Sequence, residues 1–240
     1  MTSHRIHAID LARSLALLAM AGYHLTFDLM LFAHLPPGFV FQGPWPLIAR
    51  AIASSFLFLA GVSLWLAHGN GIRWNSFWKR FAMVAGAAAL VSIATYFAMS
   101  GQFIRWGILH AIAAGSLIGL AFLRAPVILT VATAAAAFAA PHLLGRFDMF
   151  NAPQWIWLGL SSKIPPMMDY EPLLPWLCPV LLGIATAKLM TRAGAWDRLR
   201  RWQPGRLGRA ALWPGRHSLA IYLIHQPVLF GAVYVFTRYL

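Results

Sequence analysis

The stretch IHAIDLARSLALLAMAGYHLTFDLML, residues 6–31, decides the fold, because it is long and apolar enough to cross a bilayer as a helix. It nevertheless carries four ionisable residues, which are Asp10, Arg13, His24 and Asp28. At about 100° per residue these side chains lie within about 60° of one another, so they form one polar stripe on an apolar helix. Ionisable groups at membrane depth cost a few kcal/mol, face a bundle interior and mark functional sites.

The rest of the chain has the composition of a membrane protein. Of its 240 residues, 60% are hydrophobic and only 10% are charged, whereas a soluble domain has about 25% charged residues. Hydropathy predicts seven spans, covering residues 9–32, 47–66, 77–99, 106–123, 127–144, 172–190 and 218–237. We therefore expect an all-α polytopic transmembrane helix bundle, with residues 1–240 forming a single integral membrane domain.

The net charge of +13 raises the question of nucleic-acid binding, but the distribution of the charge argues against it. Most Lys and Arg residues fall in loops that seven crossings place on one side, notably at 73–80 and 192–216. Such clustering follows the positive-inside rule. It predicts a cytoplasmic N-terminus, an outside C-terminus and no nucleic-acid partner. The first span is also too long for a cleavable signal peptide.

This orientation sorts the polar residues of the spans into two groups. The group near the cytoplasmic ends comprises Asp10, Arg13, His217 and Ser218. The group in mid-span, in the outer half or just outside comprises His24, Asp28, His110, Asp169, Glu171, His225 and Gln226. The chain has only six acidic residues, and four of them belong to these two groups. No cluster has metal-ligand spacing, so no metal is expected.

His24 and Asp28 form the most specific pair, because residues at i and i+4 are neighbours on a helix. A carboxylate one turn from an imidazole can fix its tautomer and raise its basicity, as a general base needs. The alternative is a buried hydrogen-bonded pair that only joins helices.

The other polar residues also have structural alternatives. Asp10 and Arg13, at i and i+3, can be an ion pair that neutralises both charges. His110 can be a simple hydrogen-bonding residue between helices. His225 and Gln226 can satisfy carbonyl groups freed by the proline that follows them. Asp169 and Glu171 can be solvated loop acids.

Five motifs make the chain recognisable: RIHAIDLARSLALLAMAGYH (5–24), SSFLFLAGVSL (54–64), WGILHAIA (106–113), DYEPLLPWLCPVLLGI (169–184) and GRHSLAIYLIHQPV (215–228). The first two resemble the first two helices of the transmembrane acyltransferase superfamily. The other three are similar to the bacterial heparan-α-glucosaminide N-acetyltransferase catalytic-domain family. The resemblance covers nearly the whole chain.

The resemblance implies that the protein transfers an acyl group, by analogy an acetyl group, from cytoplasmic acetyl-CoA or another acyl-CoA to a sugar or glycan acceptor outside. The protein is expected in the bacterial cytoplasmic (inner) membrane, where it contacts the lipid bilayer. A homo-oligomer is compatible with the resemblance. His24 then takes the role of the catalytic first-helix histidine, oriented by Asp28. The expected acyl-CoA site comprises Asp10, Arg13, His217 and Ser218. The expected acceptor site comprises His110, Asp169, Glu171, His225 and Gln226.

One loop departs from the family pattern. The lysosomal acetyltransferase has its key histidine in the first luminal loop, before a tryptophan. Here Gln42 stands three residues before Trp45, and the nearest upstream histidine is His34. The chemistry of that enzyme therefore does not transfer directly, and two alternatives stay open: either His24 does the catalytic work, or the protein is not an acetyltransferase.

Two other classes of function fit the same residues. A proton-coupled transporter or flippase would use the polar stripe of the first helix as a conduit. A structural subunit would use it to bind a partner helix. Consumption of a CoA thioester distinguishes the enzyme from both.

Overall fold

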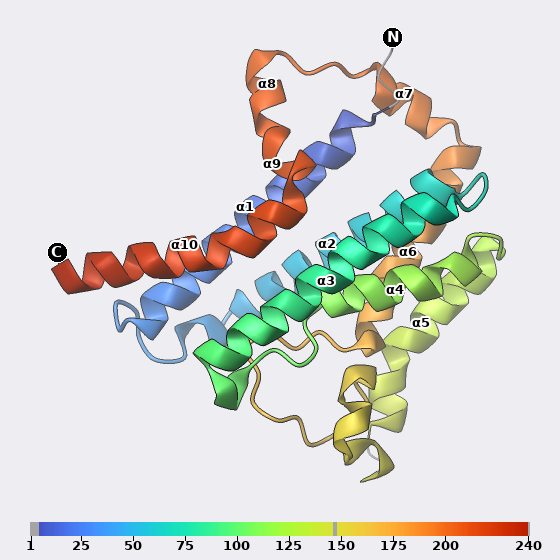
Figure 1. Ribbon diagram of the computed structural model, residues 1–240. Helices are drawn as coiled ribbons and strands as arrows, with labels where there is room; N and C mark the ends of the chain where they lie inside the picture. The colour runs from blue at the N-terminus through green and yellow to red at the C-terminus, as the bar shows by residue number, and fades with distance from the viewer. Residues whose placement is uncertain (1–4, 146–147, 240) are drawn as a thin grey trace. The chain divides into compact units, whose positions relative to one another are not determined.

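The computed structural model describes residues 5–145 and 148–239, and within them the chain is helical without a β-strand (Figure 1). The helices are α1 (His7–Leu31), η1 (Phe39–Phe41), α2 (Trp45–His68), α3 (Trp74–Ala98), η2 (Ser100–Gln102), α4 (Ile108–Phe122), α5 (Val127–Leu144), η3 (Asp148–Asn151), η4 (Pro153–Leu158), α6 (Leu173–Arg192), α7 (Ala195–Arg201), α8 (Arg206–Ala211), α9 (Trp213–Arg216) and α10 (Ser218–Tyr239). The prediction of an all-α transmembrane bundle is confirmed.

Six helices are long and apolar enough to cross a membrane, namely α1, α2, α3, α5, α6 and α10. The predicted fourth span is shorter than expected, because α4 has only 15 residues. At 1.5 Å per residue it is about 22 Å long, against a hydrocarbon thickness of about 30 Å.

The shortfall in α4 arises at its N-terminus, where residues 103–107 are not helical. This segment is held by backbone hydrogen bonds on both sides. The N–H of Met168 donates to Gln102 O at 3.0 Å, and the N–H of Glu171 donates to Trp106 O at 3.2 Å. Non-helical backbone is tolerated at membrane depth where protein satisfies its polar groups in this way.

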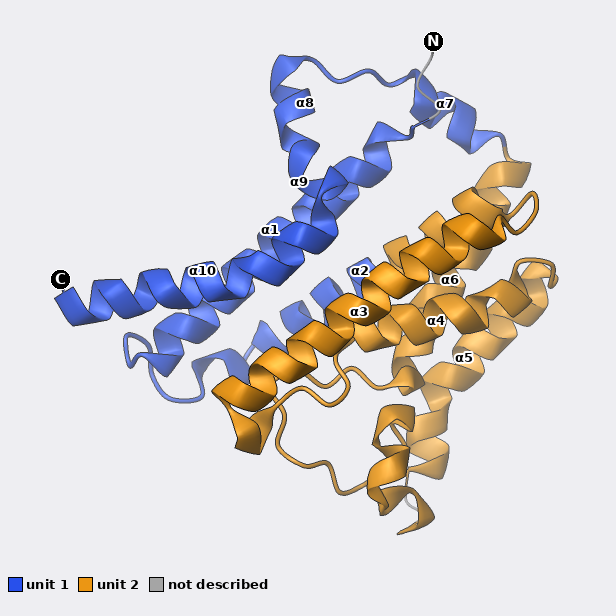
Figure 2. Cartoon of the chain, in the orientation of Figure 1, with its two compact units in different colours: residues 1–56, 194–240 blue, residues 57–193 orange. Residues whose placement is uncertain are grey.

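The chain divides into two compact units (Figure 2). Unit 1 comprises residues 1–56 and 194–240, and unit 2 comprises residues 57–193, so the boundary falls within α2. The expectation that residues 1–240 form a single domain stays a prediction.

In unit 1, α10 lies along α1 and runs in the same direction (Figure 1). Near the two N-terminal ends, the N–H of Gly215 donates to Ser14 Oγ at 2.8 Å. At the C-terminal end of α1, the ring of Phe32 lies 5.1 Å from that of Phe230 in the middle of α10. Parallel first and last spans require an odd number of crossings, as in the seven predicted, whereas six helices of the described chain have the length and hydropathy of a span. That α4 completes the seventh crossing stays a prediction. Which terminus faces the cytoplasm stays a prediction.

In unit 2, α6 crosses the second half of α2 at two glycines that leave room for the opposing backbone. A Cβ on Gly61 would collide with the carbonyl oxygen of Val180, and a Cβ on Gly183 with that of Phe58. Small residues at such crossings let membrane helices pack by close van der Waals contact. The core beside this crossing comprises Leu64, Phe77, Leu123, Ala134, Ala137, Leu173, Leu177, Leu181 and Ile184.

Lys188 on α6 is buried, with 4% of its surface exposed. Its Nζ donates to Phe122 O and, at 2.6 Å, to Ala125 O. These contacts satisfy carbonyl groups at the C-terminal end of α4, which no helical N–H can reach. The lysine therefore fixes the end of α4 against α6.

Replacing Gly183 with alanine is expected to lower the unfolding temperature of the detergent-purified protein, because the new methyl group forces the backbones of α2 and α6 apart. Gly86→Ala on α3 is the matched control, since nothing lies within 4 Å of its Cβ position. Thermal unfolding followed by intrinsic fluorescence compares the two variants. Equal unfolding temperatures would contradict the close crossing.

Candidate active site

Four of the predicted site residues come together in unit 1, where α1 and α10 lie side by side. The imidazole rings of His24 and His225 are 5.0 Å apart between centroids, in an edge-to-face arrangement. Asp28 lies one turn beyond His24 on α1 and Gln226 is the next residue after His225 on α10, and Gln226 Nε2 donates to Asp28 Oδ1 at 2.8 Å. We call His24, Asp28, His225 and Gln226 the α1–α10 cluster. Its members were assigned from sequence to two different sites, one catalytic and one for the acceptor.

Asp28 does not orient His24 as the i, i+4 spacing led us to expect. Its side chain is fully buried, its Oδ1 accepts from Gln226, and its Oδ2 has no hydrogen-bond partner among the described residues. The carboxylate is directed toward the neighbouring helix because the Gln226 amide supplies an N–H donor there. The expected His24–Asp28 hydrogen bond is thus replaced by a link between helices.

His225 is held by its own helix. Its Nδ1 lies 2.6 Å from the carbonyl oxygen of Tyr222. Since a carbonyl only accepts, Nδ1 carries the proton of the neutral ring. Pro227 has no N–H that could donate to the carbonyl oxygen of Leu223. The His225 ring bonds the carbonyl oxygen of Tyr222 and not that of Leu223. The ring is therefore not held by the carbonyl group that the proline leaves without a donor.

The α1–α10 cluster holds three buried polar atoms with no hydrogen-bond partner among the described residues, namely Asp28 Oδ2, Gln226 Oε1 and His225 Nε2. Buried polar atoms are almost always paired, and leaving one unpaired costs about 1–3 kcal/mol. All three of these atoms can accept a hydrogen bond. The cluster is therefore suited to a ligand that brings N–H or O–H groups.

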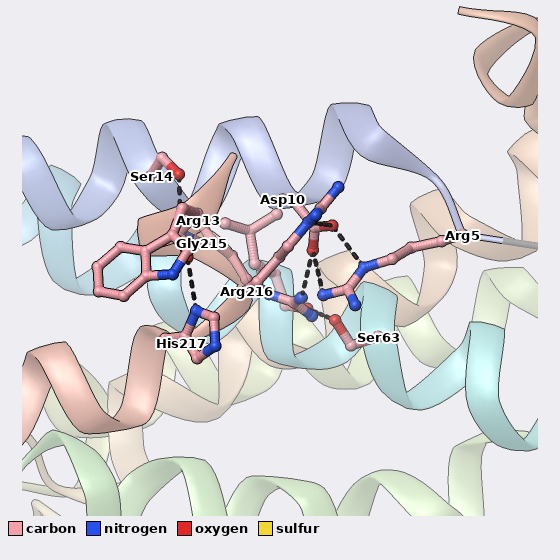
Figure 3. A network of polar contacts seen from close by, with 10 residues as sticks. Arg5, Asp10, Arg13, Ser14, Ser63, Gly215, Arg216 and His217 are labelled. Carbon is pink, nitrogen blue, oxygen red and sulfur yellow. Dashed lines mark hydrogen bonds and ion pairs between the residues drawn. The ribbon is translucent and has the colours of Figure 1, made fainter. Parts of the chain in front are cut away.

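Asp10, near the start of α1, is the centre of a second polar network (Figure 3). It is 2% exposed. Its Oδ2 lies 2.6 Å from Arg5 Nε and 3.7 Å from Arg216 Nε, and its Oδ1 lies 3.4 Å from Arg13 Nη1. The ion pair expected between Asp10 and Arg13 is present. Arg5 and Arg216 were missed from the sequence, since no helical spacing connects them with Asp10.

The α9–α10 junction brings His217, a third residue of the predicted acyl-CoA site, next to this network (Figure 3). Gly215 makes the approach possible, because a Cβ there would collide with the carbonyl oxygen of Asp10. His217 is exposed, and its Nδ1 lies 3.0 Å from the carbonyl oxygen of Trp213. Ser218 is the first residue of α10. Their role toward acyl-CoA stays a prediction.

Two residues predicted for the acceptor lie in unit 2, at the N-terminus of α4. The N–H of Gly107 donates to His110 Nδ1 at 3.2 Å, so the ring proton is on Nε2, which faces Ser92 Oγ at 3.4 Å. The Oδ2 of Asp169 accepts from the N–H of Ile108 at 3.0 Å. His110 and Asp169 thus satisfy polar groups at a helix start, which favours the structural alternative for His110.

Glu171 joins the same region of unit 2 through its backbone, which pairs with Trp106. The acceptor-binding role of His110, Asp169 and Glu171 stays a prediction. No group of three His, Cys, Asp or Glu side chains suited to a metal ion is found within residues 5–145 and 148–239.

Burial raises the pKa of Asp169, which lies in the loop before α6, from an ordinary value of 3.8 to about 6. The folded chain therefore binds this proton more tightly than the unfolded chain does. The resulting stabilisation is complete below about pH 4 and is lost as the pH rises through about 6.

The variant Asp169→Asn keeps an oxygen acceptor for Ile108 but cannot titrate. Relative to this variant, the wild-type protein is expected to lose stability between pH 4 and pH 7. Unfolding temperatures in detergent at a series of pH values measure the difference. Parallel pH profiles for the two proteins would show that Asp169 does not hold its proton in the folded state.

Comparison with known proteins identifies one family. The model of the family "Heparan-alpha-glucosaminide N-acetyltransferase, catalytic" matches residues 5–227 and includes both polar networks of unit 1. No curated protein and no solved structure gave a significant match. The six candidate spans and the family match make this an integral membrane protein. The chain belongs to the heparan-alpha-glucosaminide N-acetyltransferase catalytic family, a family of membrane acetyltransferases.

Proposed function

We propose that this protein transfers the acetyl group of acetyl-CoA, presented from the cytoplasm, to a sugar or glycan acceptor on the outer side of a bacterial inner membrane. The observation that carries the proposal is the α1–α10 cluster, with three unpartnered acceptor atoms beside His24. An amino or hydroxyl group of a sugar supplies the N–H or O–H donors that these atoms lack. The family match supplies the reaction class.

The reaction requires a base at the acceptor. An amine or hydroxyl attacks the thioester carbonyl carbon and loses a proton as it does so, while the C–S bond breaks and CoA leaves as a thiol. A positioned imidazole accelerates such a proton transfer by about 10²- to 10⁴-fold. The resemblance gives His24 the catalytic position. Asp28 and Gln226 bind the acceptor through their free oxygen atoms.

The acyl donor is expected at the Asp10 network, at the other end of α1. Three guanidinium groups surround one carboxylate there, so the network keeps a net positive charge. Positive groups at the mouth of a site attract and hold phosphate groups of the kind that CoA carries. His217, just before α10, and Ser218, its first residue, are proposed to belong to the same donor site.

The proposal is tested by incubating the purified wild-type protein with acetyl-CoA and a panel of amino sugars, neutral sugars and short glycans. Free thiol is measured with a chromogenic disulfide, and the acetylated product by mass spectrometry. We expect CoA release that depends on one class of acceptor. Solute uptake driven by a proton gradient, without thioester consumption, would instead favour the transporter.

A further inference from the structure

We infer that His225, rather than His24, is the general base that takes the proton from the acceptor. The inference rests on the proposed acyl transfer and deepens it, because it assigns the proton to one atom, Nε2 of His225. Sequence reasoning placed His225 among the residues that only bind the acceptor.

The first argument is the tautomer of the ring. A general base needs an unprotonated nitrogen that points at the substrate, and the hydrogen bond of the other nitrogen decides which one that is. The Nδ1–H of His225 donates to Tyr222 O at 2.6 Å, which leaves the lone pair on Nε2. No hydrogen bond fixes either nitrogen of His24 within the described residues.

The second argument is the surroundings of Nε2. This atom is buried and has no hydrogen-bond partner among the described residues. The titratable groups of α1 beside it are His24, 5.0 Å away between ring centroids, and Asp28, which is connected through Gln226. A buried lone pair without a partner, on a ring next in sequence to Gln226 and in contact with His24, is placed to accept the proton of a bound amine or hydroxyl.

The proton transfer balances with His225 alone. As the acceptor nitrogen or oxygen forms its bond to the acetyl carbon, its proton passes to Nε2 and His225 becomes an imidazolium. The C–S bond then breaks, and the departing thiolate takes the proton back, which regenerates neutral His225. His24 packs edge-to-face against this ring, with 5.0 Å between the ring centroids.

The test uses His225→Asn, because the Asn amide nitrogen can replace Nδ1 as the donor to Tyr222 while nothing replaces Nε2. We expect kcat to fall by at least about 100-fold, KM to change little, and the acid limb of the pH profile to disappear. His24→Asn is expected to retain the acid limb at a reduced rate. His34→Gln is the control, since His34 belongs to the same unit and bonds Thr237 at an exposed position.

Several outcomes would overturn the assignment. A raised KM with unchanged kcat in His225→Asn would make His225 a binding residue only, and loss of the acid limb in His24→Asn alone would return the base to His24. Nitrogen NMR of histidine-labelled protein gives a readout that does not depend on activity, and we expect the Nδ1–H form for His225. The Nε2–H form would contradict the assignment. Absence of any turnover by the wild type would overturn the proposed function, together with this base.

Discussion

Replacing His24 with alanine is expected to lower acetyl transfer by up to about 10²-fold while leaving the protein folded, because the change removes the ring that packs edge-to-face against His225 and positions the proposed base. His24 makes ring contacts with Tyr23 and His225, but its nitrogen atoms hold no other element of the described chain in place. The loss should therefore be found in kcat rather than in stability. Acceptor-dependent CoA release, with the unfolding temperature measured in parallel, checks both expectations.

Leu25→Ala is the matched control for this variant, since Leu25 follows His24 on α1 and its side chain is exposed. It shortens a side chain on the same helix without touching the α1–α10 cluster. Wild-type turnover by a folded His24→Ala protein would remove His24 from the reaction.

Replacing Asp10 with asparagine is expected to have the largest effect on stability. Removing one partner of a buried ion pair costs about 3–5 kcal/mol, because the remaining charge is left uncompensated. Arg5, Arg13 and Arg216 all lose their carboxylate in this variant. Their side chains are 48%, 21% and 32% exposed, so water compensates part of the loss and we expect the lower end of that range.

The control for Asp10→Asn is Asp197→Asn, which breaks an exposed pair with Arg200 at 2.7 Å. Exposed ion pairs contribute about 0–1 kcal/mol, so this variant should unfold close to the wild type. Denaturant unfolding in detergent measures both free energies. Equal stability of Asp10→Asn and Asp197→Asn would mean that the Asp10 network does not hold α1 and α9 together, and would leave only its role toward the acyl donor.

The polar residues of α1 could be identified from the sequence because helical periodicity and hydropathy are local properties. His24 and Asp28 could therefore be placed on one face before their partners were known. Their actual contacts could not, because the Gln226 amide and the His225 ring come from a helix about 200 residues further along the chain. Local spacing suggested a hydrogen bond between Asp28 and His24, but tertiary packing brings the Gln226 amide to the Asp28 carboxylate as its donor.

Several glycines allow close approaches between backbone segments. The sequence motifs contain these glycines but do not reveal this role. Gly61, Gly183 and Gly215 each lie in a motif that led to the family, and each allows one backbone to approach another. Gly107 leaves space for the Asp169 carboxylate at the start of α4. Composition alone gives no sign of such contacts, because they depend on which helices cross.

The length of α4 could not be predicted for a different reason. Hydropathy extends over residues 106–123, but the backbone of Trp106 pairs with the loop before α6 instead of continuing the helix. A hydropathy window registers apolar side chains and not the hydrogen bonds that end a helix.

Transfer across a sealed membrane tests the central claim most directly. Proteoliposomes containing the wild-type protein would be loaded with the acceptor found in the panel, and radiolabelled acetyl-CoA would be added outside, so that only molecules with the donor face outward react. The account predicts labelled acceptor inside the vesicles and equimolar CoA outside. Labelled product that forms only when acceptor and acetyl-CoA share one side would contradict transfer through the membrane, and no labelled product under either arrangement would contradict acetyl transfer itself.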